Sequence, residues 1–267
     1  IISHIRCHTK TLALLGKPED VSNISRKLMD YGLSNVRIYI GADLKQPDEQ
    51  IVSGNPADFL HRTFSALSLL YIENPNAEPL PVTYGLPDDA FIRGKVPMTK
   101  SEIRSIVLSK LKLTKNAILF DIGAGTGSIA IEAARQIPDG RVYAIERNPD
   151  GLDLIKKNSL KLQADNLTIV SGTAPECLDT LPAATHAFIG GSGGHLKEIM
   201  QLLYSRNPEI RIVITAITLE TISQIMTLQK EMSLPEPEIV QLQVSSAKKA
   251  GPYHLMQGQN PVYIVSF

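Results

Sequence analysis

The chain has 267 residues, 43% of them apolar, and its 27 basic residues balance its 27 acidic residues. This balance disfavours a general nucleic-acid binder, which normally carries a basic excess, and no apolar run reaches the roughly 18 residues that cross a bilayer. The start lacks the order of a signal peptide, and Cys7 and Cys177 form neither a CxxC pair nor a zinc-type cluster, so we expect a cytoplasmic protein without a metal site.

Residues 1–75 are predicted to form a small α/β domain. Apolar runs are typical of strands, and Pro18 lies in the first turn of a helix with apolar residues at helical spacing. Because Ile1 lies close to the first run with no leading element, we expect a fragment of a longer polypeptide; a removed tag or leader is the alternative. The expected strands cover 11–15, 36–40 and 67–72, and the helix ends at Gly32.

Residues 76–87 are predicted to be a linker, because the surrounding stretch ENPNAEPLPVTYGLP has four prolines and no periodicity. From there, residues 88–267 alternate short apolar strands with helical segments, which predicts a parallel sheet covered by helices on both faces. The expected helices include 99–113 and 128–136, and the expected strands are 117–122, 141–145, 167–170, 186–189 and 211–215.

The last two expected strands, 239–244 and 262–267, have only a loop around residues 247–261 between them. A connection without a helix favours an antiparallel closing pair. A doubly wound parallel sheet that ends in an antiparallel hairpin is similar to the Rossmann-like architecture of class I methyltransferases, which use S-adenosylmethionine.

A glycine-rich loop, FDIGAGTG at residues 120–127, joins an expected strand to an expected helix. Glycine recurs at such a turn because the chain bends sharply and leaves space for a ligand. Glu146 ends the next strand, where a carboxylate accepts hydrogen bonds from the ribose hydroxyls of an adenosine. A dinucleotide site is the main functional rival, but its spacing is G-x-G-x-x-G, not the shorter GxGxG found here. The alternatives are a tight turn for the glycines and a solvated strand end for Glu146.

The segment 172–176, with sequence GTAPE, follows the third strand of this domain. Class I enzymes place the adenine there, and small residues with backbone amides suit its flat edge. A helix start with Thr173 as the cap and Pro175 in the first turn is compatible with the same residues.

Three further segments narrow the family: RGKVPMTKSEIR at 93–104, FIGGSGG at 188–194, and KKAGPYHLM with NPVYIV between 248 and 265. With residues 172–176, they resemble the precorrin-6 methyltransferases, which methylate C15 and remove the carboxyl group of the C12 acetate arm in cobalamin biosynthesis. The resemblance covers about residues 88–267. It implies S-adenosylmethionine as the donor, a tetrapyrrole substrate with or without cobalt, and a homo-oligomer such as a tetramer.

The resemblance also implies site residues. Those that match the family's S-adenosylmethionine contacts are Thr99, Gly123, Ala124, Gly125, Thr126, Gly127, Glu146 and Ala174. The substrate carries carboxylates on its rim, so cations are expected near the mouth, and a glycine loop offers backbone N–H groups to carboxylates. The candidates are Arg93, Lys95, Lys100, Arg104, Gly191, Gly193, Gly194, Lys248 and Lys249, although each cation taken alone fits a solvated surface charge better.

The implied reaction needs little acid–base assistance. The sulfonium is already activated and the macrocycle carbon is a nucleophile, so the enzyme mainly aligns them and excludes water. Electrons released from the acetate arm drain into the conjugated ring, which requires no metal or pyridoxal cofactor. No catalytic base is therefore assigned; His195 and Tyr253 are able to supply a proton, but packing or cap roles are favoured.

The segment 11–74 resembles the back half of the C5-methylating tetrapyrrole methylases, which are often fused to the C15 enzyme as a C5,15-methyltransferase. The acidic stretch GADLKQPDEQI at 41–51 carries this match. The front half, with its own glycine-rich region, is missing, so this chain alone is not expected to methylate C5. The alternative is a small docking domain without chemistry.

The larger domain has three rivals to the precorrin hypothesis. One is a nucleic-acid methyltransferase, which would show a basic face with stacking aromatic residues; the neutral charge and the absence of tryptophan argue against it. The others are a protein-isoaspartyl methyltransferase and a non-catalytic cofactor-binding scaffold. A scaffold would bind the donor without turning over any tetrapyrrole.

Overall fold

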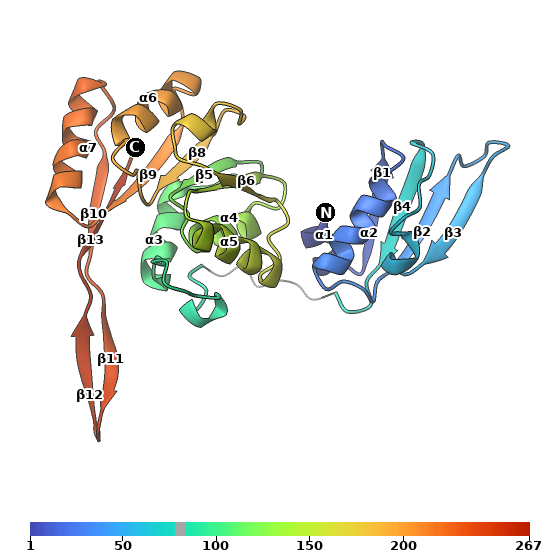
Figure 1. Cartoon of the computed structure of the whole chain (residues 1–267), viewed down its shortest axis with the longest axis horizontal. Coiled ribbons are helices and arrows are strands. Elements are labelled where there is room, and N and C mark those ends of the chain that lie inside the picture. Colours follow the sequence, from blue (N-terminus) through green and yellow to red (C-terminus); the bar gives the residue numbers. More distant parts are fainter. Residues whose placement is uncertain (78–83) are drawn as a thin grey trace. The chain divides into compact units, whose positions relative to one another are not determined.

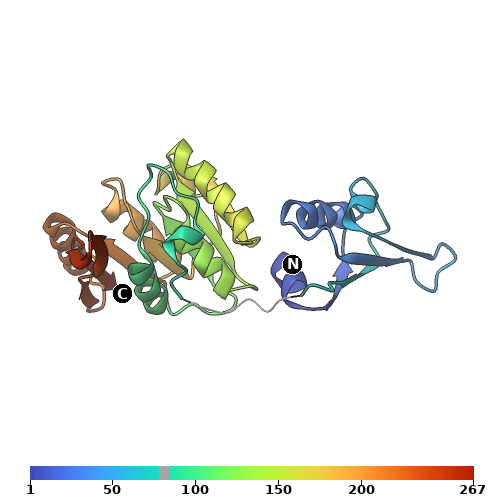
Figure 2. The ribbon, with the colours of Figure 1, turned by 90° about the horizontal axis from the view of Figure 1, so that it is seen from below.

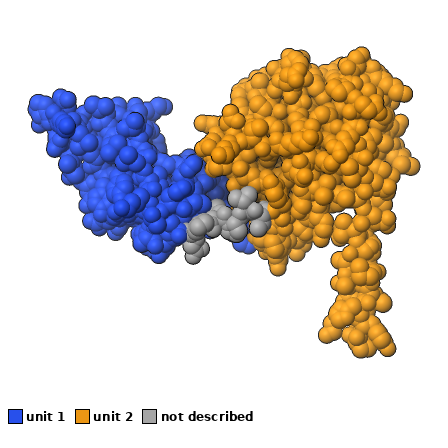
Figure 3. Space-filling view, turned by 180° about the vertical axis from the view of Figure 1, so that it is seen from behind, with its two compact units in different colours: residues 1–82, 160–165 blue, residues 83–159, 166–267 orange. Residues whose placement is uncertain are grey.

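The computed structural model describes residues 1–77 and 84–267 and divides into two compact units (Figure 3). The smaller unit comprises residues 1–82 and 160–165, and the larger comprises residues 83–159 and 166–267. The predicted linker, 76–87, falls largely on residues 78–83, which lie outside the described residues. Within the described ranges, no helix is both long and apolar enough to cross a membrane.

The smaller unit is a four-stranded antiparallel sheet of order β1-β4-β2-β3. Apolar residues of its two helices share one core with alternate residues of the strands. Three elements were not predicted: α1, which occupies the start where none was expected and is too short to show periodicity, the short helix η1, and β3, an edge strand with Ile51 70% exposed. The elements are α1 (Ile2–Cys7), β1 (Lys10–Leu15), α2 (Asp20–Asp30), β2 (Arg37–Ala42), β3 (Gln50–Gly54), η1 (Pro56–Phe59) and β4 (Ser68–Glu73).

The larger unit is a seven-stranded sheet of order β10-β13-β9-β8-β5-β6-β7. Strands β5 to β9 pair in parallel, and β13 is antiparallel to both β9 and β10, which confirms the predicted closing pair. Its strands are β5 (Ile118–Ile122), β6 (Arg141–Glu146), β7 (Leu167–Ser171), β8 (His186–Ile189), β9 (Arg211–Ala216), β10 (Glu238–Leu242) and β13 (Val262–Ser266). Its helices are η2 (Asp88–Ala90), α3 (Ser101–Leu111), α4 (Ser128–Gln136), α5 (Pro149–Lys161), η3 (Glu176–Leu178), α6 (Leu196–Arg206) and α7 (Leu219–Glu231).

Helices cover both faces of this sheet. Ile199 of α6 and Ile225 of α7 belong to one core with Phe120 and Ile122 of β5. Helix α3 contacts β8, β9 and β13, and α4 contacts β5, β6 and β7. Helices α4 and α5 lie side by side (Figures 1 and 2). All four residues of β8 are buried, as expected for a central parallel strand. The strand order reverses at β5, whose neighbours are β6 and β8, and the carboxyl ends of these strands form the edge where such sheets bind ligands.

A two-stranded hairpin, which we call the arm, occupies the region predicted to be a loop. It consists of β11 (Ser245–Ala250) and β12 (Tyr253–Gly258), which pair with each other and with no other strand among the described residues, and it projects from the larger unit (Figures 1 and 3). Every residue of both strands is exposed. The loop prediction was wrong because strands that bury neither face have no hydrophobic alternation to reveal them.

A buried ion cluster fastens residues 84–100, which we call the strap, to the larger unit. Arg104 of α3 is 0% exposed; its Nε donates to Glu132 Oε1 at 2.6 Å, and its Nη1 donates to Asp88 Oδ1 at 2.9 Å. The same guanidinium donates to the carbonyl oxygens of Leu86 and Thr99. One side chain therefore joins both ends of the strap to helix α4.

Two more buried side chains hold the strap through its backbone. Glu132 accepts hydrogen bonds from the amides of Gly85, at 2.8 Å, and Leu86. Asn158 of α5 accepts from the Ile92 amide at 2.7 Å and donates to the Ile92 carbonyl and to the Thr126 carbonyl. Asn158 thus ties the strap to the glycine loop.

Replacing Arg104 with methionine is expected to destabilise the larger unit by about 3–5 kcal/mol, because Glu132 would stay buried without its cation. The measurement is the free energy of unfolding in urea, followed by circular dichroism. Lys157→Met is the matched control: its ion pair with Asp153 is 56% exposed on both sides, so the loss should stay below about 1 kcal/mol. Equal losses in the two variants would contradict a structural role for the cluster.

Candidate active site

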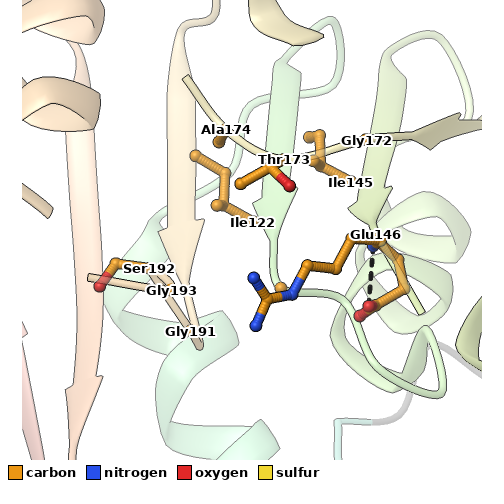
Figure 4. Close-up of a pocket in the computed structure, with 11 residues that line it drawn as sticks. Ile122, Ile145, Glu146, Gly172, Thr173, Ala174, Gly191, Ser192 and Gly193 are labelled. Carbon is orange, nitrogen blue, oxygen red and sulfur yellow. Dashed lines mark hydrogen bonds between the residues drawn. The ribbon is translucent and has the colours of Figure 1, made fainter. Parts of the chain in front are cut away.

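Two adjoining cavities open at the carboxyl ends of the central strands. The first, of about 180 Å³, lies between the ends of β5 and β6 and the segments that follow β7 and β8 (Figure 4). The second, of about 340 Å³, lies between the strap, the glycine loop and the base of the arm. Gly123 lines both, so the glycine loop forms the wall between them.

The glycine loop is shaped by positive φ angles that L side chains rarely adopt. Gly123, Gly125 and Gly127 have φ angles of +75°, +58° and +76°. A Cβ atom at Gly123 would lie 2.7 Å from the Gly191 carbonyl oxygen, and one at Gly125 would lie 3.0 Å from that of Pro97. The loop therefore packs backbone against backbone between the segment after β8 and the strap.

The Glu146 carboxylate is held in place by three backbone amides. Its Oε2 accepts from Gly125 N at 2.8 Å, and its Oε1 accepts from Arg147 N and Asn148 N, both at 2.8 Å. Helix α5 comes close behind it, because a Cβ atom at Gly151 would lie 2.8 Å from Glu146 Cγ. The carboxylate is thus fixed at the edge of the first cavity before any ligand arrives.

A second carboxylate, Asp121, lies buried under the loop and is 1% exposed. Its Oδ2 accepts from the Ala130 amide in the first turn of α4, at 2.9 Å. Burial raises the pKa of Asp121 to about 7; the Ala130 hydrogen bond opposes this, and the charge of Glu146 adds to it. Asp121 therefore caps the helix that follows the glycine loop.

The structure brings most of the predicted cofactor residues to the two cavities. Glu146 and Ala174 line the first cavity, and Thr99, Ala124 and Gly125 line the second, with Gly123 in both. Thr126 and Gly127 line neither cavity: the Thr126 side chain is 1% exposed, and Gly127 is the N-cap of α4. These two residues shape the loop through their backbone.

The predicted substrate residues are more scattered. Gly191 and Gly193 line the first cavity, and Lys100 lines the second, with its Nζ 3.3 Å from Asp88 Oδ2. The others lie outside both linings, in three places: Arg93 and Lys95 are exposed on the strap, Gly194 follows β8, and Lys248 and Lys249 are exposed on the arm.

Arg104 is a correction. The sequence predicted it as a cation at the mouth, but its guanidinium is fully buried and donates to two carboxylates and two carbonyls of the protein itself. It holds the strap that carries Thr99 and does not face a ligand. Spacing along α3 could not reveal this, because burial of an arginine depends on partners distant in sequence.

The two residues considered as proton donors lie outside both cavities. His195 occupies the N-cap position of α6, is exposed and makes no side-chain cap hydrogen bond. Tyr253 is 71% exposed on the arm. His195 therefore occupies the predicted cap position through its backbone alone, whereas the exposed Tyr253 does not support a packing role.

Several lining residues were not predicted as site residues. Arg147 and Ser192 line the first cavity, and Gln259 and Asn260 at the base of the arm line the second. Arg147 was within reach of the sequence argument, because it directly follows the strand-end carboxylate Glu146. Asn260 begins the segment NPVYIV that carried part of the family resemblance, but its place at the second cavity could not be read from the sequence.

A model of the precorrin methyltransferase domain matches residues 89–267. The chain is 40% identical over 187 residues to a probable cobalt-precorrin-6B C(15)-methyltransferase (decarboxylating) of Pyrobaculum calidifontis; the match covers 69% of this chain and 95% of the relative. It is 39% identical over 181 residues to the cobalt-precorrin-6B C(15)-methyltransferase (decarboxylating) of Salmonella typhimurium, covering 67% of this chain and 93% of the relative.

Comparison with solved structures points to the same family. The precorrin-6Y C5,15-methyltransferase of Geobacter metallireducens superimposes with a TM-score of 0.65 at 40% identity, covering 70% of this chain and 97% of that one. The precorrin-8W decarboxylase of Methanobacterium thermoautotrophicum gives 0.63 at 33% identity, with 68% and 98% covered. An S-adenosylmethionine-dependent O-methyltransferase of Thermotoga maritima, at 0.55 and 13% identity over 86% of this chain and 92% of that one, shares the fold alone. The predicted class I methyltransferase fold is confirmed.

The raised pKa of Asp121 predicts a pH-dependent contribution to stability. Because the folded state holds this proton up to about pH 7 and the unfolded state releases it near pH 4, the contribution is full below about pH 4 and is lost as pH rises through 7. Asp121→Asn removes it while keeping an acceptor for Ala130. Relative to wild type, the variant's free energy of unfolding should rise by roughly 1.4 kcal/mol per pH unit between pH 5 and 7. A pH-independent difference would mean that Asp121 is ionised throughout.

Proposed function

The chain belongs to the precorrin methyltransferase family, and we propose that it methylates C15 of precorrin-6B, or of its cobalt form, and removes the carboxyl group of the C12 acetate arm in cobalamin biosynthesis. The observation that carries the proposal is the Glu146 carboxylate, fixed by three backbone amides beside a glycine loop at the strand-order reversal. The curated relatives supply the substrate class, since they are named as decarboxylating C15-methyltransferases of cobalt-precorrin-6B.

The residues of the first cavity fit S-adenosylmethionine, which supplies an activated methyl group when bound. Glu146 Oε2 accepts a single backbone hydrogen bond, so a lone pair stays available for a ribose hydroxyl. A Cβ atom at Gly191 would meet nothing within 4 Å, so that glycine leaves open space at the cavity wall that the protein itself does not fill. Gly172 and Ala174, both small residues, line this cavity, which suits a flat base.

The chain's own part in the reaction is to position the two reactants and to exclude water. The strap, fixed by Arg104 and Asn158, places Thr99 and Lys100 at the second cavity, next to the glycine loop. These residues would hold the macrocycle next to the donor, which is the positioning that methyl transfer requires. In the decarboxylation, the electrons of the broken carbon–carbon bond pass into the conjugated ring, and the arm carbon takes up a proton. We assign no residue to that proton.

We propose further that residues 1–75 are the back half of a C5-methylating tetrapyrrole methylase domain and that the protein acts as a homo-oligomer, such as a tetramer, in the cytoplasm. The arm supports an oligomer: an isolated two-stranded hairpin is marginally stable alone, and Tyr253, Leu255 and Met256 on it are 60–71% exposed. Residues 1–77 contain no loop with the glycine spacing found at 123–127, so we do not expect C5 methylation.

Glu146→Ala should weaken binding of S-adenosylhomocysteine by more than about tenfold, or about 1.4 kcal/mol, because the ribose acceptor is lost and the Gly125 amide is released. Isothermal titration calorimetry measures the affinity. Glu209→Ala, an exposed carboxylate before the amino end of β9, is the control and should bind like wild type. Unchanged affinity in the Glu146 variant would remove the ribose assignment.

Incubation with S-adenosylmethionine and either precorrin-6B or its cobalt form should give a product that has gained one methyl group and lost carbon dioxide. Mass spectrometry identifies it, and parallel reactions show which form is preferred. Gain of the methyl group alone would contradict the decarboxylation. Donor binding with no turnover of either form would favour a scaffold.

A further inference from the structure

Arg147 reaches across the first cavity. Its backbone follows the carboxyl end of β6, whereas a Cβ atom at Gly193, in the segment after β8, would lie only 3.6 Å from its Nη1 and 3.9 Å from its Cζ. Strand β5 lies between β6 and β8, so the Arg147 side chain and the segment after β8 approach each other from the two strands that flank β5. The guanidinium therefore lies beside Gly193, in the segment after β8.

This guanidinium has no protein partner. Among residues 1–77 and 84–267, no hydrogen bond or ion pair involves its side chain, and Arg147 is exposed. The neighbouring Glu146 carboxylate already accepts three backbone amides. The segment beside it carries only one side chain, Ser192, between Gly190 and Gly194. An arginine laid over glycine backbone, with its donors unpaired, is arranged to receive an anion.

The direction of the side chain decides which ligand it meets. The residues suited to an adenine base, Gly172 to Ala174, follow β7, on the far side of β6 from β8. Arg147 points the other way, toward the glycine segment after β8. It thus faces the side of the cavity away from the proposed position of the base.

We propose that Arg147 is a substrate-binding residue that pairs, through both arms of its guanidinium, with a rim carboxylate of the tetrapyrrole. This rests on the proposed function. The carboxylate is one that does not react: an ion pair stabilises an ionised acid before loss of carbon dioxide and would slow that step. Gly193 lies beside the guanidinium, since a Cβ atom there would be in van der Waals contact with Nη1.

The test compares Arg147→Gln and Arg147→Lys with wild type, measuring kcat and KM for cobalt-precorrin-6B and the affinity for S-adenosylhomocysteine. Arg147→Gln should raise KM by about 10–100-fold, as expected for a lost charge-assisted pair, with donor affinity within about twofold of wild type. The KM of Arg147→Lys should lie between those of wild type and Arg147→Gln, because the lysine ammonium keeps the charge but cannot form two parallel hydrogen bonds with one carboxylate. Arg141→Gln, at the opposite end of β6, makes the same change of charge and should behave like wild type.

The products separate the outcomes. The ratio of methylated product to methylated and decarboxylated product should stay the same in Arg147→Gln; a change in this ratio, in either direction, would place the arginine on the reacting acetate and overturn the assignment. Weaker donor binding with unchanged KM would make Arg147 a contact of the donor and overturn the assignment also. If wild type is active and Arg147→Gln is unaffected, this assignment alone is wrong. If wild type binds the donor but is inactive, the proposed function is wrong, and the assignment with it.

Discussion

The site depends on the close approach of separate backbone segments around one loop with no side chain between them. Gly123 packs against Gly191, and Gly125 packs against Pro97 of the strap, each at a distance that leaves no room for a Cβ atom. The Gly151 position brings α5 equally close to the Gly125 carbonyl. Because these contacts involve backbone atoms alone, the shape of the cavity floor does not depend on the surrounding side chains. The ligand then meets amides and carbonyls in fixed positions.

Buried polar side chains hold these segments together. Apolar contacts are not directional and could not fix the positions of the segments as closely. The strap has few helical or strand hydrogen bonds of its own, so its amides and carbonyls need partners. Glu132, Arg104 and Asn158 supply them and at the same time fix where Thr99 enters the second cavity. Desolvation of these charges is costly, so the cluster contributes position more than stability.

The sequence was informative wherever burial is regular. All seven strands of the larger sheet were predicted to within two residues at each end, because strands covered on both faces read as apolar runs. The arm was missed because it buries nothing. At the site, the glycine loop and Glu146 followed from local spacing, whereas the burial of Arg104 and the reach of Arg147 depend on strands and helices distant in sequence.

The charges of the site are separated in space although the chain as a whole is neutral. The carboxylate of Glu146 lies on the β6 side of the glycine loop, and the charge it carries helps keep Asp121 protonated beneath it. The cations Arg147 and Lys100 lie toward β8 and the strap. Under the proposed function, this arrangement would attract a positively charged donor and a polyanionic acceptor to opposite sides of one crevice. A uniformly basic or acidic mouth would not distinguish the two reactants by charge.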